Sequence, residues 1–443
     1  MLYDLAILGS GFGGSITALV AKQMGMKPVL FEKKTHPRFA IGESSTPQAN
    51  IALSNIATKY NLPRLHPLAR YGTWKEAYPE IGCGAKRGFT YIQHPNVENE
   101  LLVTASPNGF DCDTHWYRAD LDAFLVQEVK NAGIPFFDNT IVSLHENNGW
   151  ELQSENISAK AGFLIDATGE ANPLGIPQDS SSIKTNSRVI YSHFEDVAKW
   201  SDVHGKLKHP YPCHDSALHH IFRGGWMYVL HFDNGITSAG FVLDCNERPS
   251  DTWDSLMDEF PHIKKPFQNA KKTMPLVETR RIQRCSAQIV GRNWAMLPNS
   301  AYCIDPLHST GIAHTLFCID RLMRCIQDKS GLQAYASKMR KEMGLIDKLV
   351  HGTYACMHDF ESLANFVMLY FAGADFTERQ RRAGKSTGFL NSDNQVFCDI
   401  IQHFYRHALT GTLVPSDVAE AITPWNFAGL CDPAKQNMYD YAL

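Results

Sequence analysis

The sequence predicts an α/β fold built around an amino-terminal βαβ unit, and three observations lead to it. A short apolar strand near the amino end runs into closely spaced glycines, and the next strand ends in an acid. The middle of the chain, from about 186 to 290, has the alternating apolar pattern and turn signals of β-sheet. Beyond about residue 331, helical patterns dominate. A chain of 443 residues is long enough for two or three such domains.

The amino-terminal unit is predicted from its glycines. The strand Tyr3 to Leu8 runs into the pattern Gly9-x-Gly11-x-x-Gly14, with Phe12 and Gly13 inside it. In such a turn the first glycine allows the sharp bend, the second lets a pyrophosphate approach the main chain, and the third lets the helix pack closely on the sheet. The helix that follows directs its free N–H groups toward phosphate. A dinucleotide site is therefore expected here.

The acid of the pattern is Glu32, which follows the strand 27–31. The dinucleotide fingerprint requires an acid about twenty residues after the glycines. Its carboxylate can accept both ribose hydroxyls and would repel a 2′-phosphate, so the sequence favours FAD or NAD over NADP. The adjacent Lys33 is assigned to the same edge of the site. The glycine pattern does not distinguish FAD from NAD.

Composition excludes several classes of partner. The formal charge of −4 and the pI near 6.5 give no reason to expect nucleic acid or an anionic membrane. The longest apolar run, Leu363 to Ala374, is too short to span a bilayer and is expected to be a buried helix. Eleven cysteines without a C-x-x-C pair fit neither a disulfide framework nor a zinc site, and the histidines lack metal-binding spacing. We therefore expect a cytoplasmic protein with no metal site and no membrane contact.

Further polar motifs follow predicted strands and helices. The loop 36–47 is rich in turn formers and hydroxyl groups and precedes a helix from about 48 to 60. Another helix is expected over 116–133. The strand Ala161 to Ile165 closes on Asp166-Ala167-Thr168-Gly169, a second candidate edge of the cofactor site. The strand 294–298 leads to Asp305-Pro306 and then to Ser309-Thr310-Gly311, which opens the helix 312–327.

The clearest hairpin signal lies in the middle of the chain. Trp226 to Phe232 and Ile236 to Leu243 flank the turn Asp233-Asn234-Gly235, and Asn-Gly supplies the positive backbone angles that a tight hairpin favours. We expect this sheet to face a substrate.

In order and spacing, these motifs resemble the FAD-dependent monooxygenases, and specifically their flavin-dependent halogenase-like branch. The matching pieces cover roughly the first three quarters of the chain. The resemblance implies a Rossmann-like, GR2-type FAD-binding domain over 1–185 and 286–330. It further implies an inserted antiparallel-sheet substrate domain over 186–285 and a helical carboxy-terminal region over 331–443.

The resemblance also implies which residues contact FAD. Asp305 would lie at the ribityl chain or phosphates, and the N–H groups of Thr310 and Gly311 would face the isoalloxazine ring. The complete predicted set is Gly9, Gly11, Phe12, Gly13, Gly14, Glu32, Lys33, Arg38, Glu43, Ser44, Arg118, Asp166, Gly169, Asp305, Ser309, Thr310, Gly311 and Ile312.

In the family, reduced flavin adds O₂ to give a C4a-hydroperoxide. In halogenases this species oxidises halide to hypohalous acid, which a lysine relays to an aromatic ring; in hydroxylases the distal oxygen goes to the substrate. The chain keeps only the first tryptophan of the halogenase signature Trp-x-Trp-x-Ile-Pro, at Trp226. The relay lysine falls at Lys86, with Lys75 as a rival, and His308 stands where tryptophan halogenases carry a glutamate.

These departures lead us to predict hydroxylation of an electron-rich aromatic substrate, with Lys86, His308 and His231 as catalytic candidates. His94 is a further possible base. The aromatic side chains Phe89, Tyr91, Trp226 and Tyr228 would either wall the substrate or simply pack within the sheet.

The resemblance implies as substrate a phenol, an indole, a carrier-bound pyrrole, or a tryptophan of a partner protein in quinone-cofactor biogenesis. We expect a flavin reductase or NAD(P)H to supply electrons, because no second nucleotide fingerprint is found. Three alternatives stay open: a halogenase of a phenol, pyrrole or indole, a non-catalytic FAD-bound maturation protein, and a reductase of the geranylgeranyl-reductase type.

Overall fold

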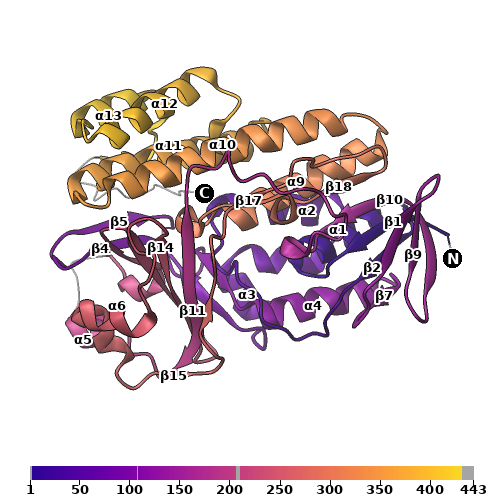
Figure 1. Cartoon of the computed structure of the whole chain (residues 1–443), viewed down its shortest axis with the longest axis horizontal. Helices are drawn as coiled ribbons and strands as arrows, with labels where there is room; N and C mark the ends of the chain where they lie inside the picture. Colours follow the sequence, from indigo (N-terminus) through magenta and orange to yellow (C-terminus); the bar gives the residue numbers. More distant parts are fainter. Residues whose placement is uncertain (1, 107, 206–209, 432–443) are drawn as a thin grey trace.

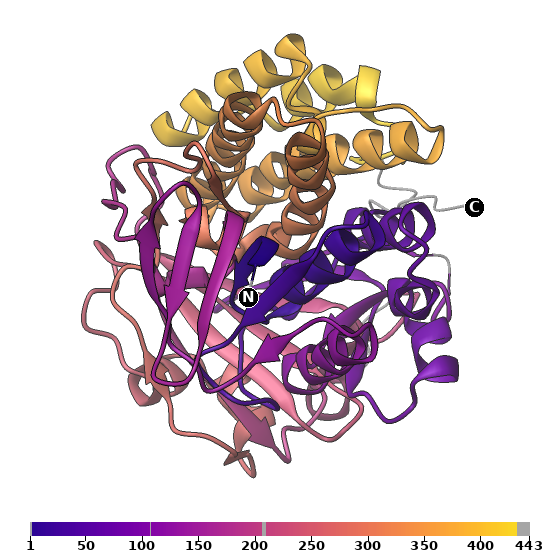
Figure 2. The ribbon, with the colours of Figure 1, turned by 90° about the vertical axis from the view of Figure 1, so that its right-hand side faces the viewer.

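The computed structural model describes residues 2–106, 108–205 and 210–431, and it has the predicted α/β fold with a helical carboxy-terminal part. Two large sheets lie side by side, and long helices cover one edge of both (Figures 1 and 2). The predicted fold class is confirmed.

The first sheet holds the amino-terminal unit. Its order is β7-β2-β1-β10-β9-β8, and β18 also pairs with β10. The strands β2, β1, β10 and β18 run parallel, so their carboxyl ends meet at one edge. The strands are β1 (Leu2–Leu8), β2 (Pro28–Phe31), β7 (Phe136–Phe137), β8 (Ser143–Glu146), β9 (Trp150–Gln153), β10 (Ser158–Asp166) and β18 (Trp294–Met296).

Helix α1 (Phe12–Gln23) packs on this sheet and contacts two further helices: α4 (Arg118–Asn131) and α9 (Thr310–Gln327). Helix α1 is buried over most of its length, because Ile16, Leu19 and Val20 recur at helical spacing. The beginnings of α1 and α9 follow β1 and the β18 segment, so both helix starts belong to the carboxyl edge of the sheet.

The second sheet has the order β15-β11-β14-β13-β12-β4-β5, with β16 also paired to β11. Its pairs are antiparallel, except that β12 and β4 run parallel. The expected hairpin is present as β13 and β14. The strands are β4 (Gly88–Gln93), β5 (Glu100–Thr104), β11 (Ser187–Glu195), β12 (Ala217–Phe222), β13 (Gly225–His231), β14 (Thr237–Asp244), β15 (Lys271–Lys272) and β16 (Val277–Glu278).

One part of the second sheet comes from outside the predicted substrate range. Strands β4 and β5 fall within 1–185, the range assigned to the FAD-binding domain, yet they extend the second sheet. The reason is burial: every residue of β4 except Gln93 is buried, so this strand needs a neighbour on each side. The domain boundaries themselves stay a prediction.

The two faces of the second sheet are covered differently. One face presents Phe89, Tyr91 and Trp226 to the main core of the protein. The other face presents Met227 and Phe241 to a separate apolar cluster that includes residues of α6 (Trp253–Glu259) and α7 (Pro261–Lys264). Successive residues of a strand therefore pack into two different apolar cores, one on each face of the sheet.

The carboxy-terminal region is a layer of helices that pack on one another (Figure 1): α10 (Leu332–Cys356), α11 (Phe360–Arg382), α12 (Gln395–Thr410) and α13 (Pro415–Ile422). The apolar run 363–374 lies within α11 and is largely buried, as expected. Among the described helices, none is both long and apolar enough to cross a membrane.

The remaining elements are α2 (Pro47–Lys59), α3 (Tyr71–Ala77), α5 (Trp200–His204), α8 (Pro298–Ala301), β3 (Cys83–Lys86), β6 (Asp113–Trp116), β17 (Arg284–Cys285) and β19 (Tyr302–Cys303). Strands β3 and β6 form a separate antiparallel pair.

Candidate active site

The turn between β1 and α1 leaves no room for side chains at its glycines. Gly9 has a φ of +92°, and a Cβ built on it would lie 2.5 Å from the carbonyl oxygen of Ala167. A Cβ on Gly14 would collide with the carbonyl oxygen of Gly9, and one on Gly13 would lie 3.2 Å from the Thr315 side chain. The turn, the helix and the neighbouring strand can therefore approach this closely only with glycine.

Two guanidinium groups border the space beside Gly11. A Cβ on Gly11 would lie 3.4 Å from an Nη of Arg118 and 3.6 Å from an Nη of Arg38. Arg118 is held in place because it donates to both carboxylate oxygens of Asp122, at 2.9 and 2.8 Å, and it lies over the ring of Phe12. A helix start beside two guanidinium groups fits a pyrophosphate.

Glu32 is an ionised, organised acceptor at the end of β2. It accepts hydrogen bonds from the main-chain N–H and the hydroxyl of Ser10, both at 3.0 Å, and pairs with Arg38 at 3.3 Å. Burial raises the pKa of this carboxyl, but these donors outweigh it and the pKa is lowered. The carboxylate thus stands where the ribose of a dinucleotide is expected, whereas Lys33 is exposed.

The second helix start, at α9, lies at the same edge of the sheet. Ser309 precedes the helix with a φ of +51°, and Thr310 begins it. The nearest atom to a Cβ built on Gly311 is Asn299 Oδ1, at 3.8 Å, so Gly311 leaves open space, while Ile312 is buried. Backbone N–H groups at this helix start can face an anionic ring system.

Asp166 and Gly169 lie at the carboxyl end of β10, beside the glycine turn. Asp166 accepts from the N–H and hydroxyl of Thr168, and burial raises its pKa. Gly169 donates its N–H to Ser300 Oγ at 3.0 Å. Within the described chain one oxygen of Asp166, Oδ2, is buried without a partner, which leaves an acceptor for a ligand.

Three predicted FAD contacts are already engaged or enclosed by protein. Asp305 accepts from Ser187 Oγ and the hydroxyl of Tyr354, both at 2.7 Å, and burial raises its pKa to about 6. Glu43 pairs with His193 at 2.8 Å and accepts from a serine hydroxyl of β14. Ser44 Oγ is buried and finds no partner among the described residues. The roles of these residues toward FAD stay predictions.

Lys86, at the end of β3, is a completely buried lysine with 0% exposure. Its Nζ donates to the main-chain oxygen of Ser45 at 2.5 Å and lies 4.0 Å above the centre of the Phe89 ring. Burial lowers the pKa of Lys86 to about 7, against the opposing influence of Asp113. The rival Lys75 is partly exposed and pairs with Asp233 at 2.7 Å.

Beyond Lys86, aromatic rings gather on the core face of the second sheet. Phe89, Tyr91 and Trp226 surround His219, with ring centres 5.8, 5.1 and 4.9 Å from its ring centre. Helix α11 adds Tyr370 and Phe371, which contact Phe89 edge-on. These six residues are called the aromatic cluster below.

His308 closes the aromatic cluster on the side of α9. Its ring stacks on Tyr370 with centres 4.4 Å apart and planes 8° apart. Burial lowers the pKa of His308 to about 3, so the ring is neutral, and in the described chain its Nδ1 has no partner. The structure thus brings His308 to the same cluster as Lys86.

The structure does not bring His231 into this cluster. It occupies the same strand face as Met227, opposite to Trp226, and its Nδ1 contacts Thr237 at 3.0 Å. The catalytic role predicted for His231 has no support in these contacts. His94 also lies elsewhere, paired with His220 at 3.1 Å.

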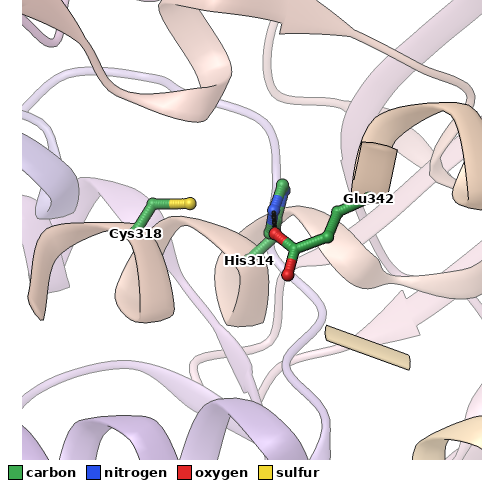
Figure 3. Close-up of side chains that lie close together, drawn as sticks. All are labelled: His314, Cys318 and Glu342. Carbon is green, nitrogen blue, oxygen red and sulfur yellow. Dashed lines mark hydrogen bonds and ion pairs between the residues drawn. The ribbon is translucent and has the colours of Figure 1, made fainter. Parts of the chain in front are cut away.

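One buried group of side chains has the residue types of a metal site, but its charge does not favour a bound cation. His314, Cys318 and Glu342 lie close together between α9 and α10 (Figure 3). Both carboxylate oxygens of Glu342 are already used by Arg321, at 2.6 and 2.8 Å, and one of them also pairs with His314. A guanidinium in this position opposes a cation, so the group is an internal ion pair.

Sequence reasoning missed several residues of the site. Asp113, His219 and Tyr370 lie around Lys86 and the aromatic cluster, but none belongs to a recognised motif. Alternation along β12 could have placed His219 on the same face as Ala217, and the apolar run of α11 signalled a buried helix. The contact between α11 and the sheet had no sequence signal.

Several known proteins are similar to this chain in sequence. The tetracycline 7-halogenase of Kitasatospora aureofaciens is 27% identical over 437 residues, which cover 90% of this chain and 78% of that protein. The monodechloroaminopyrrolnitrin halogenase PrnC of Pseudomonas fluorescens is 28% identical over 409 residues, covering 84% of this chain and 71% of that protein. No family model matches the chain.

Solved structures share the fold. Halogenase PltM, in complex with phloroglucinol and FAD, matches with a TM-score of 0.86 at 23% identity, over 95% of this chain and 94% of that one. The flavin-dependent brominase Bmp2 matches with a TM-score of 0.65 at 17% identity, over 96% and 99% of the two chains.

The glycine turn, the two arginines and the second helix start define a flavin-dependent oxidoreductase of Rossmann-like α/β fold. Its homologues are flavin-dependent halogenases, which the chain resembles over most of its length. The resemblance inferred from motif order is confirmed, and these relatives support FAD as the cofactor.

Proposed function

We propose that the protein is a flavin-dependent halogenase that transfers an electrophilic halogen through Lys86 to a small, electron-rich aromatic substrate. This changes the preference reached from sequence, which was hydroxylation, because the homologues are halogenases. It keeps FAD, a separate flavin reductase and an aromatic substrate.

The observation that carries the proposal is the state of Lys86. A lysine in water is an ammonium ion at neutral pH and has no lone pair to offer. With no exposure to solvent and a pKa lowered to about 7, a large fraction of Lys86 is neutral amine at that pH. A neutral amine is the form that can accept a halogen on nitrogen.

The residues that would hold the cofactor and the residue that transfers the halogen lie at different positions. FAD in its reduced form, with O₂, supplies the oxidation of halide to hypohalous acid. Arg38, Arg118 and Glu32 would hold the nucleotide, and the start of α9 would hold the ring. Lys86 takes the halogen as its N–X bond forms and the O–X bond breaks, which releases water. The halogen then passes to an aromatic carbon, and the amine is restored.

The surroundings of Lys86 favour an aromatic substrate of modest size. Phe89, Tyr91 and Trp226 provide flat apolar walls, and neutral His308 can accept a hydrogen bond from a phenol or indole. Each of these side chains is almost fully buried, so a substrate must fit among them. A small phenol, pyrrole or indole suits such walls better than a tryptophan within a folded partner.

The test is bromination with all components supplied. The purified protein is incubated with FAD, a flavin reductase, NADH, O₂, bromide and a panel of phenols, pyrroles and indoles, and products are read by mass spectrometry. We expect a monobrominated product that is lost in Lys86→Met and kept in Lys75→Met, with equal FAD binding in both variants. An oxygenated product in place of a brominated one, or bromination by Lys86→Met, would overturn the proposal.

A further inference from the structure

Lys86 faces one carboxyl group that no motif singled out. In the antiparallel pair of β3 and β6, Lys86 stands directly opposite Asp113, so the two side chains leave the same face of the ribbon. Asp113 is 2% exposed. A carboxyl and an amine are thus enclosed together, away from water.

Both groups have hydrogen-bonding capacity left over. Asp113 Oδ1 accepts from Asn50 Nδ2 at 2.6 Å, whereas its Oδ2 is buried with no partner among the described residues. An amine or ammonium nitrogen can make several hydrogen bonds, and in the described chain Lys86 Nζ has the Ser45 carbonyl as its hydrogen-bond acceptor. Buried groups in this state are costly unless they serve each other or a ligand.

The other titratable groups described around Lys86 and Asp113 are either uncharged or paired with each other. Around Lys86 the other titratable groups are His115 on β6 and His219 on β12, and burial lowers the pKa of both, so they are neutral. Around Asp113 lie Glu378 and Arg382 of α11, which pair with each other at 2.9 Å, and the phenol of Tyr370. Cys112 and Tyr211 also lie near Asp113, and burial raises the pKa of each, so both are uncharged. Lys86 and Asp113 are therefore the two groups of this enclosure whose protonation is linked, because they stand opposite each other and each influences the pKa of the other.

We propose that Asp113 is the proton partner of Lys86 in halogen transfer. This inference rests on the proposed function. It assigns to Asp113 the proton that the leaving oxygen takes up and the proton that the halogen-bearing nitrogen loses in each turnover.

Each proton that one atom loses in this transfer is taken up by another. The lone pair of Lys86 forms the N–X bond while the O–X electrons leave with oxygen. Asp113, as the acid, gives its proton to that oxygen and water forms; the carboxylate then takes the proton that nitrogen must lose. When the halogen moves to the substrate carbon, the N–X electrons stay on nitrogen, which takes a proton, and the proton released by the ring carbon restores the balance.

The experiment compares Asp113→Asn, Asp113→Glu and the control Asp111→Asn. Asp111 is an acid close by in sequence that pairs with Arg70 at 2.7 Å. One readout is the titration of Lys86 by the NMR signal of its ε-carbon, assigned with Lys86→Met, which needs neither flavin nor substrate. The second is the pH profile of kcat for bromination, with FAD affinity measured alongside.

In Asp113→Asn we expect the titration midpoint of Lys86 to fall below that of the wild type. Burial raises the pKa of Asp113 well above its ordinary value, but its ionised form favours the ammonium form of Lys86, and the amide cannot do so. We expect kcat to drop about 10- to 100-fold at unchanged FAD affinity, with the alkaline limb of the profile lost. Asp113→Glu should recover part of kcat, and Asp111→Asn should match the wild type.

An unchanged Lys86 midpoint, or a kcat of Asp113→Asn within twofold of the wild type, would overturn the inference. If the wild type brominates no member of the panel, the proposed function fails, while the NMR midpoint still decides whether Asp113 and Lys86 share a proton. Thermal unfolding of each variant shows that the substituted protein is folded.

Discussion

At the scale of single residues, Lys86 shows how the fold changes the chemistry of a side chain. An exposed lysine is a solvated cation, and nothing in its sequence neighbourhood says otherwise. Here Lys86, at the end of β3, is buried away from water, and its amine contacts the ring face of Phe89. The attraction between a ring face and the charged ammonium is weak compared with the hydration energy that burial removes. Burial therefore favours the neutral form of Lys86.

The pH dependence of halogenation should follow this residue. Because burial lowers the pKa of Lys86 to about 7, the neutral amine becomes more abundant as pH rises through that value. We expect the rate of bromination under saturating substrate to rise between pH 6 and 8. The rate of flavin reoxidation without halide, measured over the same range, is the control; a bromination rate that stays flat would contradict the role of the amine.

Arg118 should govern the affinity for FAD. Its guanidinium lies beside Gly11 and is fixed by Asp122, so an anion placed there gains a pre-oriented partner. We expect Arg118→Met to weaken FAD binding by about 10- to 100-fold in equilibrium dialysis, since a hydrogen bond to a charged group contributes about 1.5–3 kcal/mol. Arg223→Met, a change at a side chain 80% exposed, is the control and should bind FAD normally.

At the scale of elements, two helix starts and one turn form the candidate cofactor site. Helices α1 and α9 begin at the same edge of the first sheet, although almost 300 residues separate them in the chain. The parallel strands β1, β10 and β18 produce this meeting, because their carboxyl ends point the same way. The turn before α1 must then lack bulky side chains, so that the strands and the helix can approach one another closely.

Gly14 is the most sensitive position of that turn. A Cβ there collides with the main-chain oxygen of Gly9, and main chain cannot move aside as a side chain can. We expect Gly14→Ala to lower the free energy of unfolding by about 1–3 kcal/mol and to abolish FAD binding. Gly109→Ala is the matched control, since a Cβ there meets no atom within 4 Å, and equal stability of the two variants would contradict the packing argument.

At the scale of the whole molecule, the helical layer is joined to the nucleotide-binding part by the buried ion pair. Glu342 of α10 holds Arg321 and His314 of α9, and it also accepts the N–H of Phe389 at 2.8 Å. Because α9 begins at the candidate cofactor edge, this network connects α10 and the segment that follows α11 to that edge.

Stability should therefore depend on pH through His314. Burial lowers its pKa, but its interactions with Cys318 and Glu342 outweigh this and raise the pKa to about 9. A raised pKa stabilises the fold fully below the unfolded value of about 6.5, and that contribution is lost as pH rises toward 9. We expect the melting temperature to fall between pH 7 and 9, as followed by circular dichroism.

The matched variant is Glu342→Gln, which keeps the shape of the side chain and removes its charge. We expect it to lose about 3–5 kcal/mol of unfolding free energy, because Arg321 would stay partly buried without a counter-charge. Its melting temperature should also depend less on pH over the same range. A variant as stable as the wild type would show that the network contributes little.

The sequence predicted four parallel strands of the first sheet, β1, β2, β10 and β18, and the glycine turn. Strand, glycine pattern and helix are adjacent in the chain, and their spacing is dictated by local sterics. The hairpin β13–β14 was also predicted, since Asn234-Gly235 sets it locally. By contrast, the pairing of β4 with β12 joins segments over a hundred residues apart, and no local pattern encodes it.

The site was predictable in part for the same reason. Gly11, Arg118 and Lys86 were identified because each lies in a motif, whereas Asp113 and Tyr370 were not, because they reach the site only through strand pairing and helix packing. The sequence alone predicted a nucleotide site at the end of β1, since the requirement for glycine there is steric and local. Only the tertiary structure decided that Lys86 is enclosed with Asp113 under α11, since burial and the pKa changes it causes depend on what packs above a residue.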